Sequence, residues 1–89
     1  MGLETVEILM DLEDHFGVHI PDSSASACVT VDDLGKVIMN LLVAQGRSPG
    51  NLLEREVWDG MVAVMTKNRI PADRIQPAAK WIGDITRWG

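Results

Sequence analysis

Apolar and polar side chains alternate with a helical period in three long segments of this chain. The first, residues 3–16, has apolar side chains at intervals of three or four positions, and acids fill most of the remaining ones. The same period recurs in residues 31–44 and 51–67. A stripe with this period is typical of an amphipathic helix that buries one face. We therefore predict three main helices and no strand.

The pattern also predicts which side chains form the core. The apolar positions of the first segment are Leu3, Val6, Leu9, Met10, Leu12 and Phe16, with Ile8 beside them. Those of the second are Val31, Leu34, Val37, Ile38, Leu41 and Leu42. Those of the third are Leu53, Val57, Trp58, Met61, Val64 and Met65. Within the third helix Gly60 costs about 1 kcal/mol relative to Ala, which indicates a close helix contact there.

Residues with strong positional preferences mark the helix ends. Gly17 supplies a stop for the first helix, and Thr30 is a good N-cap for the second. Asn51 is followed three residues later by Glu54, which resembles a capping box and predicts Asn51 as the N-cap of the third helix.

Three shorter segments complete the predicted architecture. Residues 21–26 have the composition of a turn, with room for one short helical turn. Residues 46–50, Gly-Arg-Ser-Pro-Gly, are a connector short enough to join neighbouring helices. After residue 67, Pro71 and Pro77 break the chain into a loop with short helical turns. The expected anchors of this loop in the core are Trp81, Ile82 and Ile85.

Length and charge narrow the possible functions. The chain of 89 residues is one domain, and an apolar fraction of 46% suffices for a compact helical core. The net charge of −5 is unevenly divided, because residues 1–45 contain eight acids and one base whereas residues 46–89 contain seven bases and five acids. An acidic half of −7 makes nucleic acid an unsuitable partner and favours a basic protein surface.

Several other classes of site find no support. No apolar run reaches the length of about 20 residues that a membrane span needs, and no signal peptide is recognisable. The single Cys28 fits a reducing, cytoplasmic environment and is expected to be buried. His15, expected to face solvent, and His19 belong to no metal-ligand cluster and no catalytic dyad. We therefore expect no metal site and no enzymatic activity.

The N-terminal run carries a family resemblance. Residues 2–16 read Gly-Leu-Glu-Thr-Val-Glu-Ile-Leu-Met-Asp-Leu-Glu-Asp-His-Phe, and residues 20–22 read Ile-Pro-Asp. They resemble the second helix and following loop of acyl carrier proteins, with the pattern D-S-L-D-x-V-E-L, then L-E-x-x-F and I-P-D. In that family the serine before the leucine carries a phosphopantetheine arm. Gly2 stands at that position here, so the resemblance implies a carrier-like helix without the phosphopantetheine cofactor.

The C-terminal third resembles the first helix and long loop of the same family. Ile75 and Pro77 match the apolar-x-Pro of that loop, Trp81 its aromatic residue, and Asp84-Ile85 its Asp-Leu. Continued, this register also places Gly89 at the serine position.

The resemblance thus covers the whole chain in circularly permuted order. Residues 1–45 resemble the second to last helices of the family, and residues 51–89 resemble its first helix and long loop. The first helix of the family runs antiparallel to the last long one, so residues 46–50 could join them within one chain. The same contacts could form between two chains, because a short hinge favours domain swapping. A closed monomer and a swapped homodimer both remain open.

The resemblance also suggests how the chain could act. Acids on the second helix of the family meet basic patches on partner enzymes, and these positions are occupied here by Glu4, Glu7, Glu13 and Asp14, with Asp11 as an additional acid. The alternative is an ordinary solvated helix face. Trp88, near the C-terminus, is the aromatic residue expected to be exposed.

Together these observations predict an all-α, acyl-carrier-like bundle of three main helices plus a short one. The function they favour is a non-catalytic interaction module that docks through its acidic helix, for example on a fatty-acid or polyketide type enzyme. Two alternatives are a genuine carrier whose modified serine comes from a partner chain, and a protein that binds a free acyl chain in its core.

Overall fold

The computed structural model describes residues 3–81 of the chain, and their side chains from residue 5 onward. It contains the helices α1 (Leu3–Phe16), α2 (Asp22–Ala27), α3 (Val31–Ala44) and α4 (Asn51–Lys67) and the short 3₁₀ helix η1 (Ala72–Arg74). No β-strand occurs within residues 3–81, which confirms the predicted all-α class, the three main helices and the additional short one. The expected anchors Ile82 and Ile85 and the predicted exposed Trp88 lie outside the described residues, as do Gly2 and Gly89.

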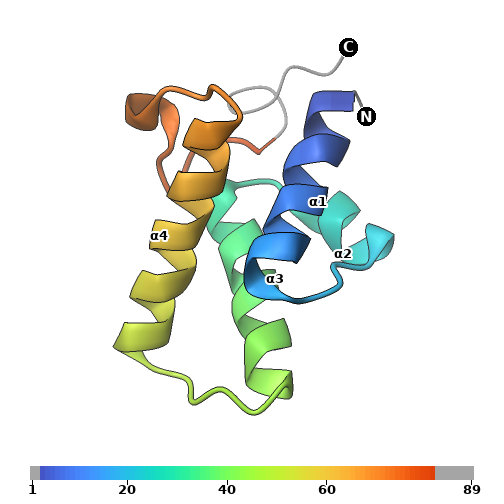
Figure 1. The fold of residues 1–89 in the computed structure, drawn as a ribbon, viewed down its shortest axis with the longest axis vertical. Helices are drawn as coiled ribbons and strands as arrows, with labels where there is room; N and C mark the ends of the chain where they lie inside the picture. The colour runs from blue at the N-terminus through green and yellow to red at the C-terminus, as the bar shows by residue number, and fades with distance from the viewer. Residues whose placement is uncertain (1–2, 82–89) are drawn as a thin grey trace.

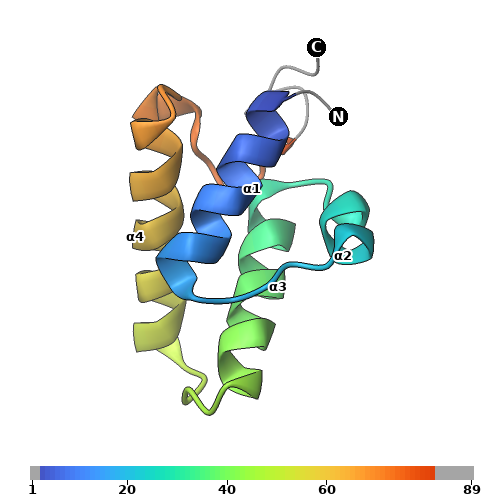
Figure 2. The same cartoon turned by 45° about the vertical axis from the view of Figure 1, so that its right-hand side comes forward.

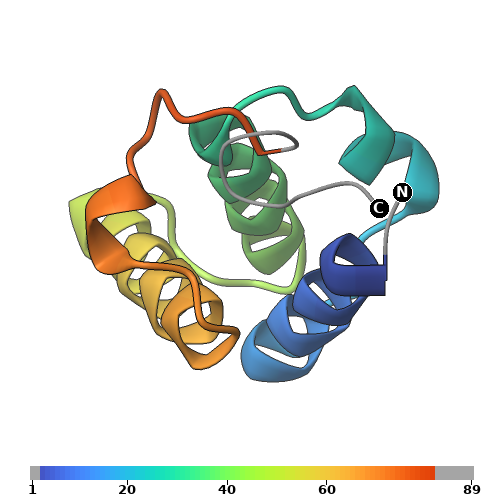
Figure 3. The ribbon, with the colours of Figure 1, turned by 90° about the horizontal axis from the view of Figure 1, so that it is seen from above.

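Helix α4 is the element that contacts both of the other long helices. It lies beside both α1 and α3 and runs antiparallel to each of them, as Figures 1 and 2 show. The short helix α2 lies on the side of α1 and α3 that α4 leaves open (Figure 3). The apolar faces of the three long helices therefore point at one common core.

Most side chains of the core lie in the long helices, at positions that the helical period predicted. Ile8 and Leu12 of α1 are fully buried, as are Met61 and Met65 of α4. Trp81 is also fully buried, which confirms it as an anchor of the C-terminal segment. The remaining buried apolar side chains are Val18, Ile20, Ala25, Cys28, Val31, Leu34, Ile38, Leu42, Leu53, Val57, Val64, Ile70 and Ile75.

Two positions of α1 differ from the predicted core. Val6 and Met10 have exposed fractions of 40% and 57%. The buried side of α1 is formed by Thr5, Ile8 and Leu12, and residues 6 and 10 fall on the opposite side because each residue turns the helix by about 100°. The prediction was wrong because apolar residues are spread around most of this helix. Five further side chains assigned to the core are only half-buried at its edge, namely Leu9, Phe16, Val37, Leu41 and Trp58.

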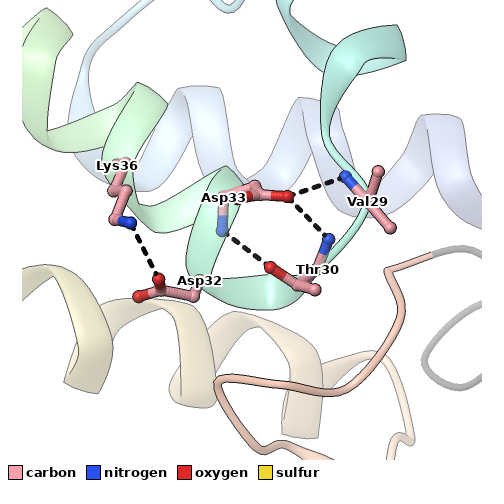
Figure 4. A network of polar contacts seen from close by, with 5 residues as sticks. All are labelled: Val29, Thr30, Asp32, Asp33 and Lys36. Atoms are coloured by element: carbon pink, nitrogen blue, oxygen red, sulfur yellow. Dashed lines mark hydrogen bonds and ion pairs between the residues drawn. The ribbon is translucent and has the colours of Figure 1, made fainter.

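The N-terminus of α3 has the predicted cap. The Thr30 hydroxyl accepts a hydrogen bond of 3.1 Å from the backbone N–H of Asp33, and the Asp33 carboxylate accepts one of 3.1 Å from the N–H of Thr30 (Figure 4). The same carboxylate accepts a second bond, from the N–H of Val29. These backbone hydrogen bonds hold the pKa of Asp33 below its usual value, since they favour the ionised form. An ion pair of 3.2 Å between Lys36 and Asp32 lies one turn further on.

The C-terminal segment completes this helix end. The N–H groups of Val31 and Asp32 donate to the carbonyl oxygens of Ala79 and Pro77, at 2.9 and 3.0 Å. The N–H of Trp81 donates in turn to the carbonyl of Val29, at 2.8 Å. N–H groups in the first turn of a helix have no partner within the helix, so this pairing satisfies two of them with backbone from the far end of the described chain.

The N-terminus of α4 does not have the predicted capping box. Asn51 is itself the first helical residue, and Gly50 is the N-cap with no side-chain hydrogen bond. The φ of Gly50 is +148°, a conformation that glycine adopts without strain. The prediction that Asn51 is the N-cap was wrong because Gly50 takes this position and the helix begins one residue earlier.

At its other end α4 stops in a Schellman motif that contains an unusual residue. The N–H of Ile70 donates to the carbonyl of Met65, and the N–H of Arg69 to that of Thr66, at 3.1 and 3.0 Å. Arg69 occupies the left-handed position of this motif, with a φ of +69°. Glycine is the usual residue there because a β-carbon is strained in this conformation.

Replacing Arg69 with glycine is therefore expected to stabilise the fold. Relief of the left-handed strain outweighs the entropy that glycine adds to the unfolded chain, so Arg69→Gly should raise the free energy of unfolding by about 1 kcal/mol. Urea denaturation followed by circular dichroism measures the difference. Arg69→Ala is the matched control: it removes the charge but keeps the β-carbon, so it should give no gain.

Gly60 confirms the predicted close helix contact. A β-carbon at this position would lie 2.5 Å from Cζ of Phe16 and 2.9 Å from Nε2 of His15, both at the end of α1. Gly35, in the middle of α3, is less restricted, because its β-carbon would lie 3.3 Å from the flexible thioether of Met61.

Alanine at these two glycines should have opposite effects. Gly60→Ala should lower the free energy of unfolding by about 1 kcal/mol, since displacing two aromatic rings costs more than the gain in helix propensity. Gly35→Ala should leave stability unchanged or raise it by up to about 1 kcal/mol. Parallel urea denaturation of both variants tests the contact, and equal stability of the two would contradict it.

Candidate docking surface on helix α1

The acids of α1 expected from the sequence fall into two groups. Glu7, Asp11 and Asp14 follow the spacing i, i+4, i+7 and therefore share one side of the helix. Glu7 and Asp14 are exposed, whereas Asp11 is half-buried and accepts a hydrogen bond of 2.9 Å from the side-chain amide of Asn68. The side chain of Glu4 lies outside the described residues.

Glu13 has a different setting. Its Oε2 accepts a hydrogen bond of 2.7 Å from the backbone N–H of Ile20 and lies 3.1 Å from Nδ1 of His19. This carboxylate therefore holds the loop that follows α1, a structural contact that the sequence pattern did not indicate. The ring of His19 is largely exposed.

An apolar strip lies next to the acids and was missed as a surface feature. Val6 and Met10 are one turn apart on the solvent side of α1, between Glu13 on one flank and Glu7 and Asp14 on the other. Exposed apolar side chains bordered by charges are a common composition of protein interaction sites. The spacing of residues 6 and 10 relative to the buried residues 8 and 12 is the signal that could have revealed this strip.

A groove separates the acidic side of α1 from α4. It has a volume of about 320 Å³ and is lined by Asp11, Asp14, His15, Ala63, Val64 and Lys67. The side of the groove formed by α1 is thus acidic, and Lys67 contributes a positive charge on the side formed by α4. The ring of His15 is exposed, as expected, and packs edge-on against Phe16 at a centroid distance of 4.8 Å.

A second groove lies between α3 and α4. Its volume is about 220 Å³, and Met39, Val57, Trp58 and Met61 form its apolar part. Charged residues border it, namely Asp32, Lys36 and Glu54. None of the residues predicted as sites lines this groove.

Two other titratable residues, Cys28 and Glu56, have structural roles. Cys28 is buried, as predicted, and its thiol donates to the carbonyl of Ser24 at 3.2 Å. Burial raises the pKa of this thiol, which keeps it in the unreactive neutral form. A hydrogen bond of 2.7 Å from Arg47 lowers the pKa of Glu56. Within residues 3–81 no three His, Cys, Asp or Glu side chains are grouped closely enough to hold a metal ion.

Part of the chain is similar to acyl carrier proteins. It is 50% identical over 37 residues to the acyl carrier proteins of Sinorhizobium fredii and Rhizobium meliloti, a match that covers 42% of this chain and 47% of each relative. It is 45% identical over 41 residues to acyl carrier protein 2, chloroplastic, of Hordeum vulgare, which covers 46% of this chain and 32% of the relative.

These similarities are local. The chain spans less than half the length of these curated relatives. No family model matches it, and no solved structure matches it. The sequence similarity and the small all-helical bundle together support an acyl-carrier-like protein. In the described part of the chain no helix is long and apolar enough to cross a membrane.

Proposed function

We propose that this chain is an acyl-carrier-like, non-catalytic module that docks on partner proteins through α1 and bears no phosphopantetheine of its own. The observation that carries this proposal is the exposed pair Val6 and Met10 beside the acids Glu7 and Asp14. Two neighbouring solvent-facing apolar side chains bordered by carboxylates are the kind of surface that protein interaction sites often present.

The chemistry of this surface defines the partner. An apolar strip gains free energy when a partner removes it from water, and flanking carboxylates orient the encounter with a basic surface. We therefore propose a partner with an apolar depression bordered by Lys or Arg, as on a fatty-acid or polyketide type enzyme. A cytoplasmic location is part of this proposal, although one named relative is chloroplastic.

We also propose that the chain is a circularly permuted form of the acyl carrier arrangement, with residues 1–45 and 51–89 as the exchanged blocks. The antiparallel course of α4 beside α3 supports it, because residues 46–50 span the gap between these two helix ends (Figures 1 and 2). The matches are 37 and 41 residues long, close to the length of one of these blocks. A permuted chain is expected to give such partial matches, because only one block at a time can align with a relative in the usual order.

Docking through α1 predicts that charge reversal on this helix weakens binding. The probe is a purified β-ketoacyl synthase of the fatty-acid type, and its affinity is measured by isothermal titration calorimetry. Glu7→Lys combined with Asp14→Lys should weaken binding about tenfold or more, because like charges would then face each other. Val6→Ser and Met10→Ser should each weaken it about fivefold, through lost apolar contact.

Matched controls lie elsewhere on the surface. Glu54→Lys combined with Asp59→Lys makes the same change in net charge on exposed positions of α4. Leu52→Ser removes a side chain that is 88% exposed. These controls should leave binding unchanged. Equal weakening by the controls, or no binding by the unmodified chain, would contradict docking through α1.

The absence of a loading hydroxyl predicts that the chain resists modification. Incubation with coenzyme A and a phosphopantetheinyl transferase should give no gain in mass, because Gly2 and Gly89 have no nucleophilic side chain. Gly2→Ser is the matched variant that restores the family residue. Mass gain in the unmodified chain would favour the genuine carrier, and a lipid co-purifying with the native protein would favour the free acyl-chain binder.

A further inference from the structure

The groove between α3 and α4 takes no part in the proposed docking through α1. Its volume is about 220 Å³, and no residue of α1 lines it. A cavity of about 150 Å³ already holds a molecule the size of benzene, whereas pockets for small-molecule ligands have about 300–1,000 Å³. The groove therefore has room for one long side chain of a partner protein.

Gly35 lines this groove from α3 and contributes no side chain to fill it. A β-carbon at this position would lie 3.3 Å from Sδ of Met61 and 3.9 Å from Cγ1 of Val57, so these parts of the two helices are level with each other. The helices are antiparallel (Figures 1 and 2). Met39, one turn further along α3, and Glu54, one turn earlier in α4, therefore lie toward the same end of the groove.

Two side chains of α4 give the groove a preference for a cation. Trp58 is half-buried, and Glu54 precedes it by four residues, so both lie on one side of the helix. The face of an indole ring attracts cations, as a carboxylate does. The carboxylate of Glu54 is exposed and takes part in no ion pair within the described part of the chain. The cation that lines the groove, Lys36, is already paired with Asp32 at 3.2 Å (Figure 4).

We propose that this groove binds an arginine side chain of a partner protein, with the guanidinium between the carboxylate of Glu54 and the ring of Trp58. Arginine has an apolar stem and a planar cation, which stacks on aromatic rings and pairs with a carboxylate through two hydrogen bonds. The stem lies along Met39 and Met61, whose flexible thioethers adapt to its shape. Lysine fits less well, because its ammonium group has no plane with which to stack or to form such a pair.

A single anchored side chain gives a weak contact. Exposed ion pairs and cation–π contacts contribute little individually. We therefore expect an isolated peptide with one arginine to bind with a Kd of about 1 mM, whereas a partner protein gains further affinity from the contacts around its arginine. Neither Glu54 nor Trp58 belongs to α1, so this site is independent of the proposed docking surface.

Titration with a short peptide tests the site. The probe is acetyl-Gly-Leu-Arg-Leu-Gly-amide, and NMR spectra of the ¹⁵N-labelled protein follow its binding up to about 10 mM peptide, as suits a weak contact. The shifted N–H signals should cluster at Gly35, Met39, Glu54 and Trp58. Glu54→Gln and Trp58→Leu should each weaken binding about fivefold, since each removes one partner of the guanidinium. The same peptide with Lys in place of Arg should bind about threefold more weakly or worse.

Matched controls make each outcome decisive. Asp59→Asn removes an exposed carboxylate of α4 that does not line the groove, so it should leave the Kd unchanged. Lys36→Gln should not weaken binding, because the arginine does not use this cation. Circular dichroism verifies that every variant is folded.

Several results would overturn the proposal. They are the absence of saturable shifts at the groove, equal affinity for the Arg and Lys peptides, and equal weakening by Glu54→Gln and Asp59→Asn. A larger loss from Lys36→Gln than from Glu54→Gln would also overturn it, since the groove would then favour an acidic group. None of these outcomes bears on the affinity for a β-ketoacyl synthase, so docking through α1 is judged separately.

Discussion

The backbone pairing between the C-terminal segment and the start of α3 is the constraint on which the rest of the fold depends. It supplies acceptors to the N–H groups of Val31 and Asp32 and leads directly to Trp81, whose fully buried side chain fills the core. Because the segment must return from the end of α4 to reach α3, the pairing also holds α4 in place beside both of its neighbours. Local capping by Thr30 and long-range closure thus meet at a single helix end (Figure 4).

Once α4 is fixed in this way, the surface of α1 follows from helix geometry. Thr5, Ile8 and Leu12 face the core, so residues 6 and 10 must face solvent. Thr5 is a notable member of the buried side, since its hydroxyl finds no hydrogen-bond partner among the residues that the structure describes. The fold therefore accepts a polar group inside and apolar groups outside on the same helix, which stability alone does not favour.

The sequence was sufficient to predict the helices, but it did not predict which side chains of α1 lie at the surface. Periodicity predicted the bounds of α3 correctly, because Thr30 and the apolar stripe agree on them. It could not separate Val6 and Met10 from the core, since apolar residues surround most of α1 and only the position of α4 selects the buried side. The hydrogen bond from Ile20 to Glu13 and the left-handed conformation of Arg69 depend on the backbone geometry of loops, which no residue pattern encodes. The family resemblance identified the acidic helix, but the cation Lys67 beside it became visible only when the chain was folded.

That juxtaposition changes which partners the proposed docking through α1 can select. A uniformly acidic surface would attract any basic partner, whereas an acidic strip with a basic border repels a partner whose positive patch extends over the groove. The best complement is then a surface with positive charge opposite Glu7 and Asp14 and negative charge opposite Lys67. In the proposed docking, selectivity therefore comes from the groove between α1 and α4 as well as from α1 itself.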